Sequence, residues 1–182
     1  MDAVAEDPTT IELSRSELRA VAGYAVACAR TVLPIFEGER PDDQRPRAAI
    51  NAAQGFADGA ERTRALRDRA WAAHRAAQET RDAGQAAASA AARAAGDAAG
   101  AAYLHPLPKA TQVRHILGSA AHAARGFELV AGDDHRVGAD HIAQLRSLIP
   151  PGVVEVLRRY PVAPPGGGRV GELLRQLDAS LR

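Results

Sequence analysis

The sequence is poor in the residue types on which many enzymes and disulfide-stabilised proteins depend. It contains one cysteine, Cys28, in 182 residues, which excludes an intramolecular disulfide. Aromatic residues make up 4% of the chain, and β-branched residues are sparse. The chain also lacks a nucleophile elbow, a zincin motif and a dinucleotide-binding fingerprint. These absences exclude most familiar enzyme classes and give little support for a β-sheet.

The chain carries almost no net charge. Its 23 basic and 22 acidic residues leave +1, far from the basic excess of a nucleic-acid-binding protein. The alanine-rich run 83–102 is long enough to suggest a membrane span, but Gln85, Arg93 and Asp97 interrupt it at different helical angles. The opening "MDAVAEDPTT" is acidic and lacks the apolar centre of a signal peptide. We therefore expect a cytoplasmic protein that binds neither nucleic acid nor membrane.

Alanine is abundant and points to an all-α fold. The chain has 42 alanines, and alanine, arginine, leucine and glutamate are strong helix formers. Because alanine buries little area, stability must come from many close helix contacts around a few large residues. The sequence predicts an antiparallel bundle of about five main helices with two or three short C-terminal helices.

Capping and helix-breaking residues divide the chain into segments. Ser14–Glu17 fits a capping box, Pro46 suits a first helical turn, and Pro106 and Pro108 end a helix. We expect a flexible tail over 1–13, a bundle over 14–132, and a C-terminal extension over 133–182. The expected helices are 14–34, 45–57, 63–82, 84–104, 109–131, 139–149, 152–160 and 168–181.

The last helix has an apolar stripe that needs a docking site. The stripe follows "PVAPPGGG", whose composition is that of a linker. The linker lets the helix dock on its own bundle or on that of a neighbouring copy, and we favour docking on its own bundle. We expect the protein to be a monomer or a homodimer. The stripe consists of Val170, Leu173, Leu174, Leu177 and Leu181.

Three histidines, His105, His115 and His122, lie within eighteen positions. His115 and His122 share a helix face with glycine and serine but are seven positions apart, whereas two zinc ligands on one helix need a spacing of three or four. His105 lies beyond a proline break. We expect no metal and no cofactor, and interpret the histidines as hydrogen-bonding or solvent-exposed residues, with a shared polar pocket as the alternative.

Two further groups of residues are candidate sites. Trp71, His74 and Gln78 share a flank of the third helix; a lone tryptophan is usually a core residue, and a binding pocket is the alternative. "DDHRVGADH" (133–141) mixes oxygen and nitrogen ligands, but Asp140 is more simply a helix-start residue and the others solvated loop.

Four segments in fixed order resemble a known family. They are "RPRAAINAA" (45–53), "RDRAWAAHRAA" (67–77), "AAARAAGDAAGAA" (90–102) and "HILGSAAHAA" (115–124). Over residues 14–131 the chain resembles the putative immunity protein family of bacterial polymorphic-toxin systems, small alanine-rich helical proteins. The resemblance implies a cytoplasmic, non-catalytic protein that binds and neutralises a cognate toxin. It supplies no binding residues.

Two functions are therefore in view. For an immunity protein, the first candidate partner-binding surface is the loop 37–44, where four carboxylates cluster without lysine: Glu37, Glu39, Asp42 and Asp43. The alternative is a small-molecule-binding protein or cofactorless enzyme. Its pocket would lie between the third and fifth helices and be lined by Trp71, His74, His115 and His122.

Overall fold

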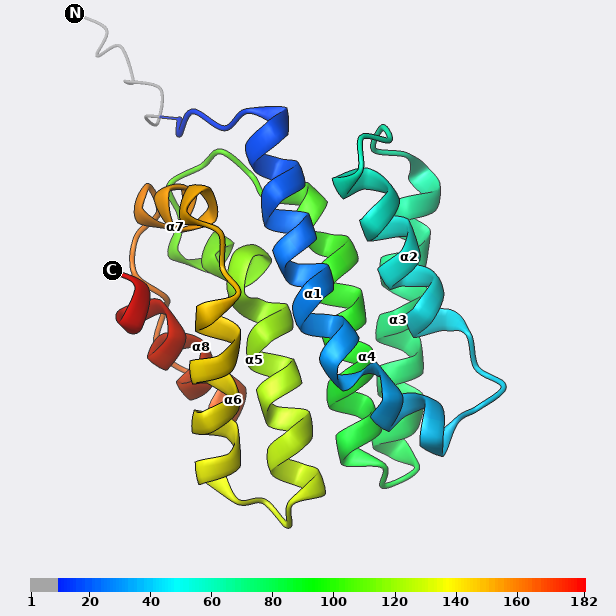
Figure 1. Cartoon of the computed structure of the whole chain (residues 1–182). Helices are drawn as coiled ribbons and strands as arrows, with labels where there is room; N and C mark the ends of the chain where they lie inside the picture. Colours follow the sequence, from blue (N-terminus) through cyan, green and yellow to red (C-terminus); the bar gives the residue numbers. More distant parts are fainter. Residues whose placement is uncertain (1–9) are drawn as a thin grey trace, which may run out of the picture.

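The computed structural model describes residues 10–182, and these residues form an all-α protein (Figure 1). The predicted fold class is confirmed. Ten helical elements follow one another along the chain, and the 3₁₀ turns are labelled η: α1 (Arg15–Glu39), α2 (Arg45–Ala57), α3 (Arg64–Asp82), α4 (Ala86–Gly100), η1 (Ala101–Tyr103), η2 (Ala110–Gln112), α5 (Val113–Val130), α6 (His135–Ser147), α7 (Pro151–Arg158) and α8 (Gly168–Leu181).

Three of the eight α-helices within residues 10–182, α1, α3 and α6, begin with a side-chain cap. At α1, the Ser14 hydroxyl accepts a hydrogen bond from the Glu17 backbone N–H at 3.1 Å, and the Glu17 carboxylate accepts one from the Ser14 N–H at 2.8 Å. The predicted capping box is therefore present. Thr63 caps α3 in the same way through the Leu66 N–H. These side chains satisfy N–H groups that the first turn of a helix leaves free.

Four predicted boundaries were wrong. The helices expected at 84–104 and 109–131 end at Gly100 and begin at Val113, and the 3₁₀ turns η1 and η2 lie between them. Helix α1 does not stop at Pro34 but continues to Glu39. The carbonyl that Pro34 leaves without a helical donor belongs to Arg30, which is exposed, so water can take the place of the missing bond. Helix α6 begins at His135 because Asp134 accepts a hydrogen bond from the Arg136 N–H. Asp140, the residue expected to start this helix, lies inside it.

Part of the predicted tail is held against the bundle. The first nine residues of the segment 1–13 lie outside the described residues. The Ile11 N–H donates to the Pro106 carbonyl at 2.7 Å, and the Glu12 carbonyl accepts from Arg159 at 2.8 Å. Ile11 and Leu13 also pack against the core. Residues 11–13 are thus anchored.

Helices α4 and α5 form the centre of the bundle. Helix α4 contacts α1, α2, α3 and α5, and α5 in turn contacts α1, α6 and α8. Every residue from Ala88 to Ala99 except Arg93 is buried. Alanine makes this possible, because its small side chain allows neighbouring helices to approach from all sides. Helix α1 is, within 10–182, the one helix long and apolar enough to cross a membrane, and more than half of its apolar window is buried.

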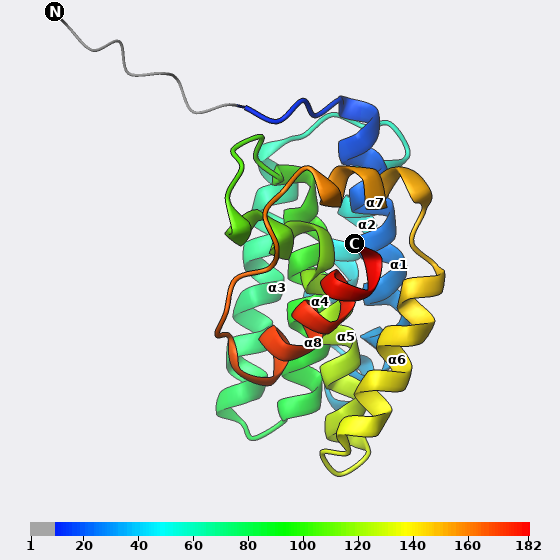
Figure 2. The same ribbon diagram turned by 90° about the vertical axis from the view of Figure 1, so that its left-hand side faces the viewer.

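The C-terminal helices cover the side of α5 away from α3. Helix α8 packs across α5 and α6 of its own chain, and the segment that connects α7 to α8 runs along the side of the bundle (Figure 2). The four leucines of the predicted stripe are buried, whereas Val170 is half-buried.

The connecting segment has a defined conformation in spite of its linker composition. Gly166, Gly167 and Gly168 all have positive φ angles, of 87°, 77° and 57°, which side chains other than glycine rarely adopt. The Arg175 guanidinium donates to the Gly166 carbonyl at 2.6 Å, and the Ala163 N–H donates to the buried Asp178 carboxylate at 2.8 Å. These bonds fix the direction from which α8 enters.

Candidate functional site

A cleft of about 560 Å³ lies between α3, the end of α4 with η1, and the start of α5. We call it the α3–α5 cleft. Three arginines, two aromatic residues and two histidines line it, together with small and polar side chains: Arg67, Ala70, Trp71, His74, Gln78, Arg93, Gly100, Tyr103, Arg114 and His115. It thus contains three of the four predicted pocket residues, and the volume falls in the range of ligand pockets.

An aspartate lies at the floor of the cleft. Asp97 of α4 is only 8% exposed and lines an inner recess of about 270 Å³ together with His74, Gly100, Arg114 and His115. Its Oδ1 lies 3.8 Å from Nε2 of His74 and 3.5 Å from Nη2 of Arg114. Its Oδ2 lies 3.6 Å from Nε2 of His122. One buried carboxylate is therefore surrounded by groups from α3 and α5.

Two glycines make room for this arrangement. A Cβ atom at Gly96 would lie 2.6 Å from the His74 ring, and one at Gly118 would lie 2.7 Å from Oδ2 of Asp97. Both distances are too short for a real side chain. On the small-residue face of α5, Gly118 therefore allows close approach, and the approaching group is a carboxylate.

The three clustered histidines have different surroundings. His115 makes a 3.0 Å hydrogen bond through Nδ1 with the Gly100 carbonyl, which is the bonding role expected for it. His122 is 7% exposed and faces Asp97 from the far side, where it lines a second cleft of about 480 Å³ beneath the segment 164–171. His105 is exposed in the loop before α5 and is not part of either cleft.

Burial controls the protonation of the site histidines. It lowers the pKa of His122 to about 4, with Asp97 opposing the shift and Arg114, Arg93 and His74 adding to it. Burial likewise lowers the pKa of His74 and of His115. These imidazoles are thus neutral at pH 7. The charges that remain on the cleft are those of three arginines and one carboxylate, a net +2.

The expectation that Trp71 is a core residue was wrong. Its side chain is 61% exposed at the rim of the α3–α5 cleft, and its ring meets the His74 ring edge-on with centroids 6.3 Å apart. The buried residues of α3 are Leu66, Ala70, Ala73, Ala76, Ala77 and Thr80. Trp71 lies outside these buried positions of α3, and its side chain remains exposed.

The predicted acidic surface is largely paired within the chain. The Glu37 carboxylate accepts from Arg47 at 2.6 Å, and Asp43 is held by Arg45, which also bonds Glu79. Glu39 accepts from the Gln85 amide at 3.0 Å, while Asp42 is exposed without an ion pair to residues 10–182. The hollow over this loop, about 710 Å³, is lined by three acidic and three basic residues, Glu39, Asp42, Asp43, Arg40, Arg45 and Arg69, with no aromatic residue.

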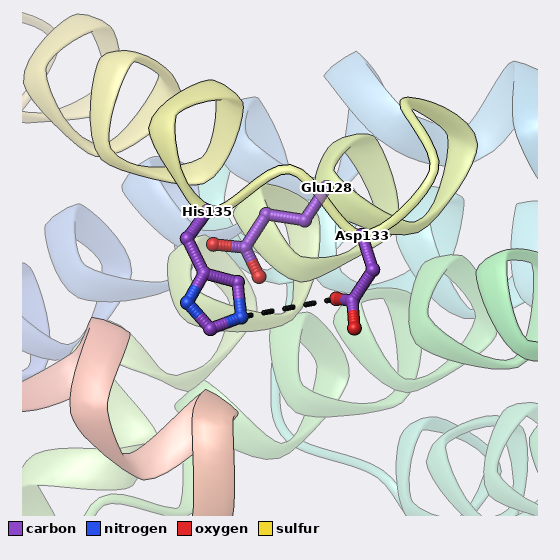
Figure 3. A group of neighbouring side chains, drawn as sticks. All are labelled: Glu128, Asp133 and His135. Atoms are coloured by element: carbon purple, nitrogen blue, oxygen red, sulfur yellow. Dashed lines mark ion pairs between the residues drawn. The ribbon is translucent and has the colours of Figure 1, made fainter.

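A second cluster, at the α5–α6 turn, joins Glu128 with Asp133 and His135 (Figure 3). The three residues present ligand atoms within 4.8 Å of one another. However, the fully buried Glu128 already accepts from Arg125 at 2.8 Å and from Nε of Arg169 at 3.0 Å, and Arg125 also pairs with Asp133. Two arginines thus balance two carboxylates, and a divalent ion would have to displace them. We interpret the cluster as an anchor for α8.

Sequence reasoning missed Asp97 and Arg93 as site residues. Both interrupt the alanine run of α4, one helical turn apart, and they were used only to argue against a membrane span. A charge in a helix that is otherwise alanine and glycine must be buried or line a hollow, and a buried charge needs partners. The two isolated charges in this alanine-rich helix therefore indicated a polar site.

A family model matches residues 12–148, and its description is Imm-5 like putative immunity protein. The chain belongs to this family. The predicted resemblance is thereby confirmed, and the Imm-5 like match extends 17 residues beyond Ala131, where the predicted resemblance ended. It includes every residue that lines the α3–α5 cleft, whereas α7 and α8 lie outside it. No curated protein and no solved structure matches the chain.

Proposed function

We propose that this member of the Imm-5 like family binds a cognate bacterial toxin and neutralises it without catalysing a reaction. Family membership supports a protein partner of this kind. The proposal includes a cytoplasmic location, as the sequence resemblance implies, which cell fractionation would test.

The observation that carries the choice of surface is the exposure of Trp71. Binding energy at protein interfaces concentrates in a few tryptophan, tyrosine and arginine side chains at the centre of the contact. The α3–α5 cleft combines Trp71, Tyr103 and three arginines on one surface. An exposed indole beside a tyrosine and three arginines has the residue composition of an interface hot spot, which supports a partner that covers it.

The acidic segment 37–44, expected as a loop but helical up to Glu39 of α1, is the weaker candidate for the main contact. Of its four carboxylates, Glu37 and Asp43 are neutralised by arginines of the same chain, and Glu39 accepts a hydrogen bond from Gln85. A partner would have to break these bonds before it could form its own. Asp42 is the residue of the loop most available for contact.

The test is toxin protection by single variants. The toxin would be identified by pull-down from the native bacterium, and its toxicity measured in cells that co-express each variant. We expect Trp71→Ala to reduce protection strongly while changing the free energy of unfolding by about 0.5 kcal/mol or less, as exposed substitutions do.

Asp42→Asn serves as the matched variant on the loop. Protection by Asp42→Asn should equal that of the wild type. Full protection by Trp71→Ala, or loss of protection by Asp42→Asn alone, would move the contact surface to the loop. Failure of the wild-type protein to protect against any toxin it captures would refute the immunity function.

A further inference from the structure

Arg93 has no obvious structural role. It is the one residue between Ala88 and Ala99 that is not buried, and its half-buried side chain makes no hydrogen bond or ion pair with residues 10–182. Every other half-buried arginine in this range has such a partner: Arg19, Arg40, Arg45, Arg125, Arg169 and Arg175. A partly desolvated guanidinium without an anion is unfavourable unless something else binds it.

The carboxylate nearest to this region is already engaged. Asp97 is buried between Arg114, His74 and His122. Its Oδ2 and the Nδ1 of His122 have no hydrogen-bond partner among the described residues, and both atoms are buried. These two atoms lie on the side of Asp97 that faces His122 and the second cleft, so the polar groups there are incompletely satisfied. Asp97 is already close to three neighbours. Arg67 and Arg93 therefore have no carboxylate partner among residues 10–182.

The charge and shape of the arginine side chains favour a carboxylate. Three arginines and one aspartate give +2, so the cleft attracts an anion. A carboxylate has one charge and the planar shape that arginine binds through two N–H groups. Beside it, Trp71 and Tyr103 offer apolar rings, and Arg67 lies 5.0 Å from the Tyr103 ring centre.

We propose that the α3–α5 cleft binds an aspartate or glutamate side chain of the toxin between Arg93 and Arg114, with an adjacent apolar residue of the toxin against Trp71. The inference rests on the proposed function and adds the chemistry of the partner. The toxin carboxylate supplies the anion that Arg93 lacks.

The experiment measures the affinity of the full-length protein for the captured toxin by calorimetry. Arg93→Gln should weaken binding about 10- to 100-fold, because a charge-assisted hydrogen bond is lost. Arg93→Lys should recover part of that loss by restoring the charge without the planar fork. Arg30→Gln is the matched control: Arg30 is exposed on α1 and does not line the α3–α5 cleft, and its replacement should leave the affinity unchanged. Because Arg93 makes no internal pair, Arg93→Gln should keep the wild-type melting temperature.

A charge exchange identifies the toxin residue. Arg93→Glu should abolish binding, and substitution of arginine for the correct acidic residue of the toxin should restore it. Restoration would establish the contact. If Arg93→Gln and Arg93→Glu bind as tightly as the wild type, the inference is wrong although the immunity function stands. If the wild type binds no toxin, the proposed function fails and the inference fails with it.

A separate titration distinguishes a toxin carboxylate from a free anion. Trp71 is the only tryptophan, so protein labelled with 5-fluorotryptophan gives a single fluorine resonance from the rim of the cleft. Sodium glutamate and sodium phosphate, each added without toxin, should shift this resonance only at tens of millimolar. Saturation by either salt below about 0.1 mM would assign the cleft to a small anionic metabolite and overturn the proposal.

Discussion

At the scale of single residues, the site depends on a carboxylate that the bundle buries between two imidazoles. Removing a carboxylate from water is costly unless charges and donors surround it. Arg114 supplies the charge for Asp97, and the neutral rings of His74 and His122 supply polar contacts from opposite sides. Burial therefore keeps the His122 imidazole neutral near pH 7. Protonation at lower pH opposes folding.

The stability of the protein should fall as pH is lowered from 7 to 5. The pKa of His122 is about 4 when folded, compared with 6.5 as the ordinary value, so the unfolded chain takes up a proton first. The contribution of His122 to the free energy of unfolding is fully present above pH 6.5 and is lost as pH falls toward 4. About 2 kcal/mol of this contribution is lost by pH 5. Urea unfolding at a series of pH values measures this slope.

His122→Gln tests the assignment, because glutamine cannot be protonated. The variant should show a clearly shallower slope between pH 7 and 5, with a remainder from His74, His115 and His141, whose pKa values burial also lowers. Glu17, with a pKa of about 2, contributes only at lower pH. An unchanged slope would show that His122 is protonated without loss of packing.

At the scale of helices, glycine has opposite effects at different positions. Gly118 of α5 faces Asp97, and a Cβ there would also lie 3.0 Å from the Cγ of Arg114. Gly55 of α2 has no atom within 4 Å of the place its Cβ would occupy. Alanine is favoured over glycine in any helix by up to about 1 kcal/mol, so only the neighbours distinguish the two sites.

We expect Gly55→Ala to raise the free energy of unfolding by about 0.5–1 kcal/mol and Gly118→Ala to lower it by about 1–2 kcal/mol. In the second variant, overpacking against a buried carboxylate exceeds the gain in helix propensity. Chemical denaturation of both variants gives the comparison. A stabilised Gly118→Ala would mean that Asp97 moves freely, which its burial argues against.

Helix positions were predictable from the sequence because they depend on local chemistry. Ser14, Thr63 and Gly84 mark ends that hydrogen bonding and backbone angles determine within one turn. Which groups meet across helices is not local. Asp97 reaches His122 only because the alanines of α4 let α5 approach, and no spacing along the chain encodes that distance. For Trp71 the periodicity of α3 was informative, and the frequency with which tryptophan is buried outweighed it.

At the scale of the whole molecule, the C-terminal extension meets the α3–α5 cleft at one edge, where Arg93 and Arg114 also line the second cleft beneath residues 164–171. All residues that line the cleft precede Ile116, and helices α7 and α8 lie beyond the residues that match the family. Helix α8 instead stabilises the opposite side of α5. It contributes Arg169 to Glu128 and four buried leucines to the core. The extension therefore contributes to stability, and the proposed toxin-binding surface lies on the bundle.

Truncation after Ala163 tests this division. It removes α8, whose four leucines each stabilise by roughly 1.5–3 kcal/mol when buried, an amount that the entropy of ordering the segment partly offsets. It also leaves Glu128 with Arg125 as its one remaining guanidinium partner. We expect a loss of several kcal/mol in the free energy of unfolding, with no change of oligomeric state by light scattering. Below the new melting temperature, toxin affinity should remain within about threefold of the wild type.

Conversion of a dimer into a stable monomer would instead make α8 an assembly element that docks on a second copy. Loss of toxin binding by a folded truncated protein would place the contact surface on the side of α5 that α8 covers.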